Sequence, residues 1–512
     1  MITKINSCAF LGIDGVIIET EVDVSKGVPS FEIVGLPDTA IKESKERVRS
    51  ALKNSKIPFP SMKYTVNLAP ASIKKEGALF DFPIAAGLMC SLKLIPTAPL
   101  NNKMIIGELS LTGDIRPANG VLAAAIAAKQ EGMDGIFVPE ENAAEASVVD
   151  GLKVYPVKSL SHFLLHCTGE QPISPYENTE VLSADNDKIP LPDFSEVKGQ
   201  ESAKRALEIA AAGGHNCLMV GSPGTGKTML SKRLPTILPD LTFKESLEVT
   251  KIHSISGTLP PGTSLIRTRP FRSPHHTISA NGMSGGGRIP RPGEVSLAHH
   301  GVLFLDELPE FHKDALEVLR QPLEDSKITI SRVASTLTYP CNIMLITAMN
   351  PCRCGFLNDP VHECTCSPRQ VQQYLAKISG PLLDRIDIHI EVNPILYEDL
   401  ENKSAPSRSS VEMKECVLKA RKIQEERFKN DGIFTNSEMS ASHIEKYCVL
   451  GEAESNMLKS AFEKLGLSAR AYNRILKVAR TIADLDGKEN IEKKHLSEAI
   501  RYRSMDCKFK NT

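Results

Sequence analysis

The feature that most constrains this 512-residue chain is one eight-residue stretch between an apolar run, Cys217–Val220, and a helical pattern. The stretch has glycines at its first, fourth and sixth positions and ends in Lys-Thr. Glycines let backbone N–H groups turn toward phosphate oxygens, and the N-terminus of the helix that follows adds positive potential. The lysine reaches the terminal phosphates, and the threonine hydroxyl can bind magnesium. The pattern predicts a nucleotide-binding loop formed by Gly221, Ser222, Pro223, Gly224, Thr225, Gly226, Lys227 and Thr228.

A second apolar run, Val302–Leu305, ends in the carboxylates Asp306 and Glu307. A carboxylate at a strand end beside a phosphate loop holds magnesium together with the loop's Thr228, and a neighbouring carboxylate orients or deprotonates the attacking water. The alternative, a strand end with two solvated acids, becomes unfavourable once the phosphate loop is present. The two motifs together therefore predict nucleotide hydrolysis with Asp306, Glu307 and Lys227 as catalytic groups.

Together these motifs resemble those of AAA+ ATPases. The resemblance implies that Asn350, which follows the apolar strand Ile343–Thr347, is the polar sensor that positions water near the γ-phosphate. It also implies that Gln200, in the segment Asp193–Gln200, belongs to the adenine-side element, which favours ATP over GTP. The implied cofactors are ATP and magnesium.

Two arginines extend this resemblance. Arg385 lies in Gly380–Asp387, which resembles the arginine-finger segment of the branch that contains MCM helicases and magnesium-chelatase ATPase subunits. A finger supplied across a subunit boundary implies a ring, commonly a homo-hexamer, whereas Arg385 taken alone fits an ion pair with a neighbouring aspartate. Arg470 resembles the lid's second sensor, and Arg474, one helical turn further on, can exchange roles with it.

The stretch between the phosphate loop and Asp306 indicates a narrower family. Its segments Arg269–Ser279 and Gly285–Ala298 resemble those of the magnesium-chelatase-like ComM/YifB family. The resemblance implies a hexameric DNA helicase that promotes branch migration in natural transformation or recombination, with branched or single-stranded DNA as partner. A chelatase-like or chaperone-like ATPase that remodels a protein is the alternative. Because the formal net charge is only -1, DNA would have to meet local basic clusters.

The glycine-rich part of that stretch carries two arginines, Arg288 and Arg291. Such a segment suits a mobile loop in the pore of a ring, where arginines grip phosphates, and we name both residues as candidate DNA contacts. A structural hairpin near the nucleotide is the alternative. The adjacent His275 and His276 are interpreted as structural residues.

The N-terminal region resembles the proteolytic fold of Lon, through Gly107–Gly120 and Phe137–Asn142. Lon-type proteolysis uses a Ser-Lys dyad, and Ile84 and Leu122 stand where that dyad is expected. We therefore predict no peptidase activity.

Composition and patterning place these motifs in an α/β chain with several domains. We expect a Lon-protease-like α/β domain at 1–167, a linker at 168–192, an AAA+ P-loop α/β core at 193–395 and a C-terminal helical lid at 405–507. The sequence contains neither a signal-peptide pattern nor an apolar run of about 18 residues, which indicates a cytoplasmic protein without a membrane partner.

Four cysteines cluster directly after Asn350. Four thiolates are enough for a tetrahedral zinc site, although the Cys-x-Cys pairs are closer than the commoner spacing and His362 could replace one ligand. The alternative is a loop with reduced thiols. We predict a structural zinc held by Cys352, Cys354, Cys364 and Cys366.

Overall fold

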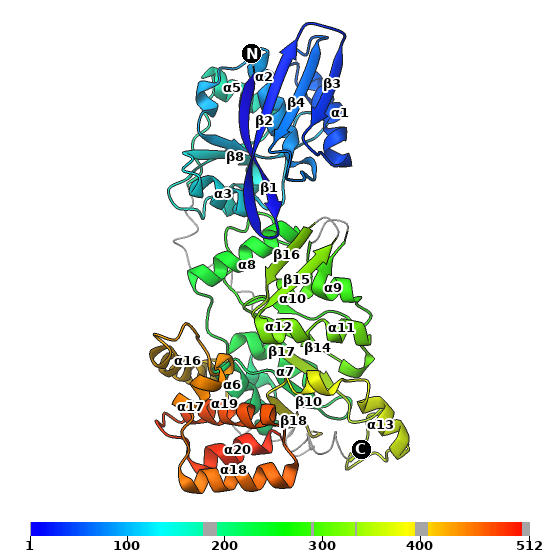
Figure 1. Cartoon of the computed structure of the whole chain (residues 1–512), viewed down its shortest axis with the longest axis vertical. Helices are drawn as coiled ribbons and strands as arrows, with labels where there is room; N and C mark the ends of the chain where they lie inside the picture. Colours follow the sequence, from blue (N-terminus) through cyan, green and yellow to red (C-terminus); the bar gives the residue numbers. More distant parts are fainter. Residues whose placement is uncertain (1, 178–191, 288–290, 333–334, 395–407, 504–512) are drawn as a thin grey trace. The chain divides into compact units, whose positions relative to one another are not determined.

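The computed structural model describes residues 2–177, 192–287, 291–332, 335–394 and 408–503 (Figure 1). The chain forms two compact units, residues 1–187 with 243–266 and residues 188–242 with 267–512. The predicted fold class is confirmed, with mixed α/β structure in both units and a helical C-terminal region. Within the described ranges, every helix is too short or too polar to span a lipid bilayer. The predicted boundaries around 168–192 and 396–404 fall largely outside those ranges and stay predictions.

The first unit is built on a seven-stranded mixed sheet with the strand order β3-β4-β2-β1-β5-β8-β9. The two long strands β1 and β2 form an antiparallel hairpin with Leu11 opposite Asp14, whereas β5, β8 and β9 pair in parallel. The strands are β1 (Thr3–Leu11), β2 (Asp14–Ser25), β3 (Ser30–Val34), β4 (Lys63–Ala69), β5 (Lys103–Ile105), β8 (Gly135–Pro139) and β9 (Lys153–Val157), with a short hairpin of β6 (Glu108–Leu109) and β7 (Ile115–Arg116).

Two apolar helices fill the core of this unit. In α2 nearly every side chain is buried, which is the pattern of a helix surrounded by protein. Ile84 of α2 and Leu122 of α3 are both 0% exposed, so each serves packing. Helices of this unit include α1 (Thr39–Asn54), α2 (Asp81–Ser91), α3 (Val121–Gln130), α4 (Ala143–Ala146), α5 (Leu160–Thr168) and α8 (Phe243–Ser256).

Helix α8 joins the first unit although it follows the phosphate loop in the sequence (Figure 1, green). The backbone N–H of Gly120, at the start of α3, donates to the carbonyl oxygen and to the hydroxyl of Ser254, each at 3.1 Å. The ammonium of Lys251 lies 2.5 Å from a carboxylate oxygen of Asp14 in the β1–β2 hairpin. These contacts fix α8 against α3.

The second unit contains a five-stranded parallel sheet with the order β11-β14-β17-β10-β18. Its central strands are buried at almost every position, as expected for a parallel sheet covered on both faces. Strand β17 lies between β10 and β14, so the ends of all three strands meet at one edge. The strands are β10 (Cys217–Val220), β11 (Phe271–Arg272), β14 (Val302–Leu305), β17 (Met344–Met349) and β18 (Ile388–Glu391).

Helices and two hairpins surround this sheet. They include α6 (Glu201–Gly213), α7 (Lys227–Arg233), α9 (Ala280–Ser284), α10 (Glu294–Leu297), α11 (Lys313–Glu317), α12 (Arg320–Asp325), α13 (Pro368–Leu375) and α14 (Gly380–Leu383). The hairpins pair β12 (Gly285–Gly286) with β13 (Arg291–Pro292) and β15 (Lys327–Arg332) with β16 (Ser335–Pro340).

The C-terminal part of the second unit is helical, as the sequence predicted. Side chains of α16 and α19 share one hydrophobic core with β10, β14 and β17, so these C-terminal helices pack directly on the five-stranded sheet. The lid helices are α16 (Ser410–Arg427), α17 (Ala441–Tyr447), α18 (Glu452–Leu465), α19 (Ala469–Leu485) and α20 (Lys493–Arg501).

Candidate nucleotide-binding site and cysteine cluster

The loop between β10 and α7 has the backbone conformation that a phosphate cradle needs. Gly224 and Gly226 have φ values of +80° and +86°, which lie in the left-handed region that favours glycine. A Cβ at Gly221 would lie 2.3 Å from the carbonyl oxygen of Val392, so the close approach of the chain after β18 also requires glycine there. Helix α7 begins at Lys227, directly after the loop.

Lys227 lies inside this loop and is 8% exposed. Its ammonium donates to the carbonyl oxygens of Gly221 and Ser222 at 2.7 and 2.9 Å, and it lies 3.5 Å from the amide oxygen of Asn350. Burial lowers the pKa of Lys227, while the charge of Asp306 acts in the opposite direction. The structure thus brings the loop's lysine and the predicted sensor together.

The acidic pair at the end of β14 lies beside the same loop. The hydroxyl of Thr228 donates to a carboxylate oxygen of Asp306 at 2.6 Å, so the two predicted magnesium ligands are in direct contact. Glu307 follows with φ +53°, a rare conformation for a residue other than glycine, and its side chain is 57% exposed. The imidazole Nδ1 of His276 lies 3.5 Å from a carboxylate oxygen of Glu307.

Gln200 connects the predicted adenine-side segment to this site. Its side-chain amide donates to the carbonyl oxygen of Asn393 at 2.6 Å and to that of Thr225 at 3.4 Å. Gln200 therefore lies against the phosphate loop and the chain after β18, where it bridges the two.

The two predicted arginines occupy other positions. Arg385 is 8% exposed, donates to the carbonyl oxygen of Pro381 at 2.7 Å and pairs with Glu324. Arg470 is exposed. None of the hydrogen bonds and ion pairs found among the described residues joins Arg385 or Arg470 to the phosphate loop of the same chain.

Arg474, the alternative lid sensor, holds the lid to the core. It pairs with the buried Asp387 and donates to the carbonyl oxygen of Arg385 at 3.0 Å. His215 lies 3.3 Å from the same carboxylate. Burial opposes ionisation of Asp387, but the charge of Arg474 and the contact with His215 hold its pKa well below the usual range. Arg474 is thus committed to a structural ion pair, whereas Arg470 projects from α19.

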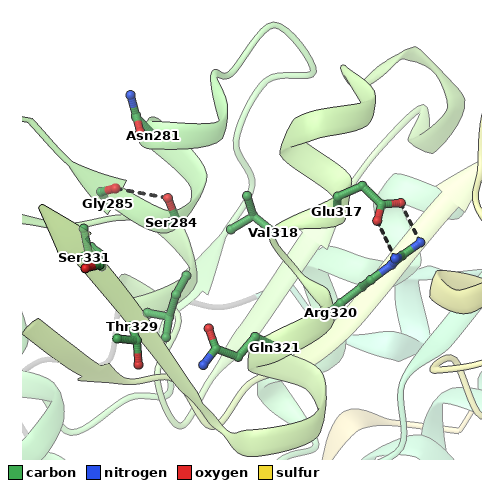
Figure 2. Close-up of a pocket in the computed structure, with 11 residues that line it drawn as sticks. Asn281, Ser284, Gly285, Glu317, Val318, Arg320, Gln321, Thr329 and Ser331 are labelled. Carbon is green, nitrogen blue, oxygen red and sulfur yellow. Dashed lines mark hydrogen bonds and ion pairs between the residues drawn. The ribbon is translucent and has the colours of Figure 1, made fainter. Parts of the chain in front are cut away.

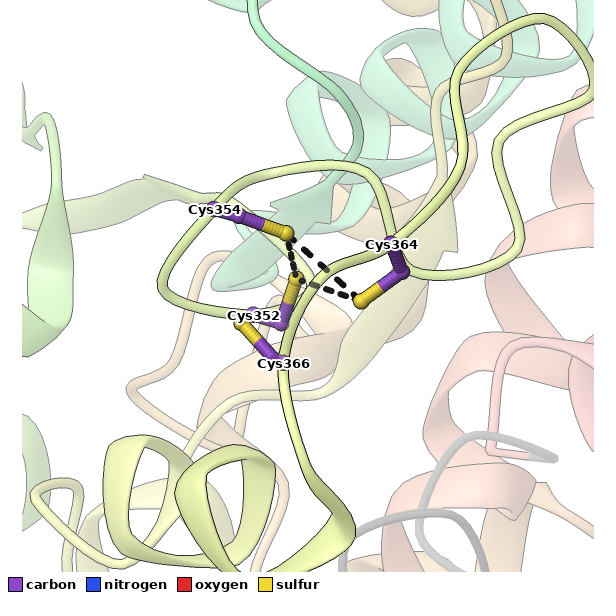
Figure 3. Close-up of side chains that lie close together, drawn as sticks. All are labelled: Cys352, Cys354, Cys364 and Cys366. Carbon is purple, nitrogen blue, oxygen red and sulfur yellow. Dashed lines mark hydrogen bonds between the residues drawn. The ribbon is translucent and has the colours of Figure 1, made fainter.

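The four predicted zinc ligands lie together in the loop between β17 and α13 (Figure 3). The Sγ atoms of Cys352, Cys354 and Cys364 are 3.3 to 3.7 Å apart, and with Cys366 all four lie within 4.8 Å of one another. A tetrahedral zinc site with Zn–S bonds of about 2.3 Å has S···S edges of about 3.8 Å, so the set fits that ion. His362, the alternative ligand, instead lies 3.4 Å from a carboxylate oxygen of Asp359.

The glycine-rich stretch forms the hairpin of β12 and β13. Arg291 is exposed on β13, whereas Arg288 lies outside the described residues. Close to this hairpin, α9, α12 and β15 enclose a hollow of about 460 Å³ (Figure 2). Its lining mixes uncharged polar, apolar and charged residues, with Ser284, Thr329 and Ser331 on one side and the ion pair of Glu317 and Arg320 on the other.

Sequence reasoning missed three features near these sites. His276 was interpreted as structural, yet it lies beside Glu307. Asp359 lies beside the phosphate loop, and the side chain of Ser222 is the first cause that lowers the pKa of Asp359 to about 2. The β15–β16 hairpin was also missed, although the alternation of isoleucine with hydroxyl residues from Ile328 to Ser331 is a signal for a half-buried strand.

The parallel strand order, the glycine loop before α7, the acidic pair after β14 and the polar residue after β17 define a P-loop ATPase of the AAA+ class. Family models described as "Magnesium chelatase, subunit ChlI", "Subunit ChlI of Mg-chelatase" and "Magnesium chelatase, subunit ChlI C-terminal" match residues 193–400, 20–142 and 407–503. The chain belongs to the magnesium-chelatase-like ComM/YifB family.

Relatives with matching length support this assignment. The chain is 42% identical over 501 residues to the competence protein ComM of Haemophilus influenzae, covering 98% of this chain and 97% of the relative. It is 41% identical over 503 residues to the YifB protein of Escherichia coli, with the same two shares. A partial match to Lon protease 2 of Bacillus subtilis, 29% identical over 153 residues, covers 28% of this chain and 27% of that protease.

Proposed function

We propose that this ATPase is a motor that acts on DNA, of the helicase or translocase type, and that it promotes branch migration during transformation or recombination. The observation that carries the hydrolytic part is the direct contact of Thr228 with Asp306 beside Lys227 and Asn350. The DNA part is supported by the full-length similarity to a protein named for competence.

In this proposal each residue at the meeting point of β10, β14 and β17 has a defined task. Lys227 binds the terminal phosphates of ATP, and Thr228 and Asp306 hold magnesium, an assignment that their 2.6 Å contact fits. Bound magnesium neutralises charge on the phosphates. Glu307 orients and deprotonates the attacking water, and Asn350 positions that water near the γ-phosphate.

The proposal includes a homo-hexameric ring. Arg385 would then reach the γ-phosphate in a neighbouring subunit, where its charge stabilises the transition state. It would have to leave Glu324 on assembly, which is feasible because the Glu324 side chain is 50% exposed. Arg470 would read the nucleotide state from α19.

For the DNA contact we propose the surface formed by the β12–β13 and β15–β16 hairpins. Arg291 provides an exposed guanidinium, and the predicted partner Arg288 belongs to the same segment. On the β15–β16 hairpin, exposed hydroxyl residues face each other across the strands, with Thr329 and Thr338 at 3.3 Å. Hydroxyls and arginines are common donors to backbone phosphates.

The test is ATP hydrolysis with and without a four-way DNA junction, together with a branch-migration assay on the same junction. We expect stimulation that weakens as salt rises, because phosphate contacts release counterions. The Arg291→Ala variant should lose part of the stimulation, whereas Arg369→Ala, a change at another exposed arginine of the same unit, should not. Equal hydrolysis with and without junction or single-stranded DNA would refute the proposal.

The chelatase descriptions of the family models favour a second candidate, an ATPase that remodels a protein partner. Hydrolysis that is independent of DNA and is stimulated by a bound protein would support it. Peptidase activity is not part of either proposal, since Ile84 and Leu122 occupy the positions of the dyad and are buried. Casein degradation by the purified protein would contradict that assignment.

We also propose that the four cysteines hold a structural zinc ion. The support is the sulfur cluster, which supplies four ligands and leaves no open position for catalysis. Metal analysis of the purified protein should give about one zinc per chain, and a metal-free protein would refute this site.

A further inference from the structure

The cysteine cluster lies in the loop that connects the sensor strand to α13. Asn350 follows the last residue of β17, and Cys352 comes two residues later. Residues 355–363, between the second and third cysteines, contain neither helix nor strand. A segment without regular structure keeps one conformation only if other contacts hold it, and a metal that joins its two ends is an effective constraint.

This segment packs directly on the phosphate loop. Gly355 has φ +91°, and a Cβ added there would lie 2.7 Å from Cδ of Pro223. The ring of Pro223 therefore packs on the backbone of Gly355, and a side chain at position 355 would displace it. The contact joins the residue after Cys354 to the residue at the third position of the phosphate loop.

Asp359 provides a second contact from the same segment. Its side chain is 2% exposed, and the neighbouring side chain of Ser222 is the first cause that lowers the pKa of Asp359. Its Oδ1 also accepts the backbone N–H groups of Val361 and His362, both at 2.9 Å. These backbone bonds orient the carboxylate, so it can hold Ser222 in place only while the segment keeps this conformation.

We propose that zinc bound by the four cysteines acts as a clamp on the nucleotide site, by fixing the segment that presents Gly355 and Asp359 to Pro223 and Ser222. ATP affinity then depends on zinc occupancy. The inference rests on the zinc site proposed above, and it is independent of DNA.

Three variants test whether zinc affects ATP binding through the segment 355–363. Cys364→Ser with Cys366→Ser removes two ligands, and Asp359→Asn removes the charge that holds Ser222 without touching a cysteine. Glu363→Gln is the matched control, since Glu363 is an exposed acid of the same segment. For each full-length protein we would measure zinc content, melting temperature and the affinity for a fluorescent ATP analogue.

We expect the double cysteine variant to lose zinc and to bind the analogue at least about tenfold more weakly, and Asp359→Asn to keep zinc and to bind about tenfold more weakly. Glu363→Gln should match the unmodified protein in zinc and affinity. Unchanged affinity in Asp359→Asn would overturn the clamp, as would a folded, zinc-free cysteine variant with unchanged affinity. If the cysteine variant does not fold, Asp359→Asn decides. The DNA proposal fails separately, through absent stimulation by the junction.

Discussion

Among the single residues, Glu307 has the most narrowly defined role in the proposed mechanism, because only a carboxylate at this position can accept the proton of the attacking water. Its carboxylate follows Asp306, the proposed magnesium ligand, and is 57% exposed, so a water molecule can reach it. We predict that Glu307→Gln keeps ATP binding and loses turnover by about 10²- to 10⁴-fold, because the amide cannot accept the proton of the attacking water. Analogue binding and phosphate release measure the two effects.

The control for this prediction is Glu310→Gln. Glu310 is an exposed acid three residues further on that pairs with Lys377, so its loss should leave turnover close to that of the unmodified protein. Turnover by Glu307→Gln equal to that of the control would remove Glu307 from the proposed mechanism.

At the residue scale, the sequence predicted those residues whose roles depend only on their immediate neighbours in the chain. The spacing of Gly221, Gly226 and Lys227 is sufficient for a phosphate loop because backbone geometry and helix start are set within a few residues. Contacts such as Asp359 with Ser222 join positions far apart in the sequence, and no local pattern encodes them. The same holds for His276 beside Glu307.

At the level of secondary-structure elements, the sequence predicted where strands form, but it did not predict which strands and helices lie next to one another. The apolar runs at β10, β14 and β17 are visible in the sequence, but their order in the sheet depends on non-local pairing. Helix α8 is the clearest case, because its Ser254 binds Gly120, which lies 134 positions earlier. No periodicity within α8 indicates that partner.

A buried carboxyl close to Ser254 of α8 makes the stability of the first unit depend on pH. Glu145 is 4% exposed, and burial raises its pKa to about 7, although hydrogen bonds with Asn142 and Ser254 oppose the shift. The neutral form is therefore favoured in the folded state. Its stabilising effect is complete below the unfolded pKa near 4.5 and is lost as the pH rises through about 7.

We predict that the first unit unfolds more easily as the pH rises from about 5 to about 8, with a change of about 3 kcal/mol from this group. Glu145→Gln should flatten that dependence because a neutral amide replaces the titrating group. Glu141→Gln, at an exposed acid four positions earlier, should keep it. Denaturant unfolding followed across this pH range measures the effect, and identical pH profiles for both variants would contradict the assignment.

For the whole molecule, the decisive question is whether the catalytic groups of one site come from one chain or two. Within a chain, Glu307 lies at the phosphate loop side of the sheet, whereas Arg385 is paired with Glu324. A head-to-tail ring would bring the arginine of one subunit to the Glu307 of the next. This arrangement can be tested without knowing the DNA substrate.

We predict that Arg385→Ala and Glu307→Gln proteins, each inactive alone, recover ATP hydrolysis when mixed. In a random equimolar ring, about a quarter of the interfaces pair an intact Glu307 with an intact neighbouring Arg385, so recovery should approach that fraction of the unmodified rate. Steady-state phosphate release after subunit exchange measures it, with each variant incubated alone as the control. If Arg385 acted within its own chain, every subunit in the mixture would lack one group, and no activity would return.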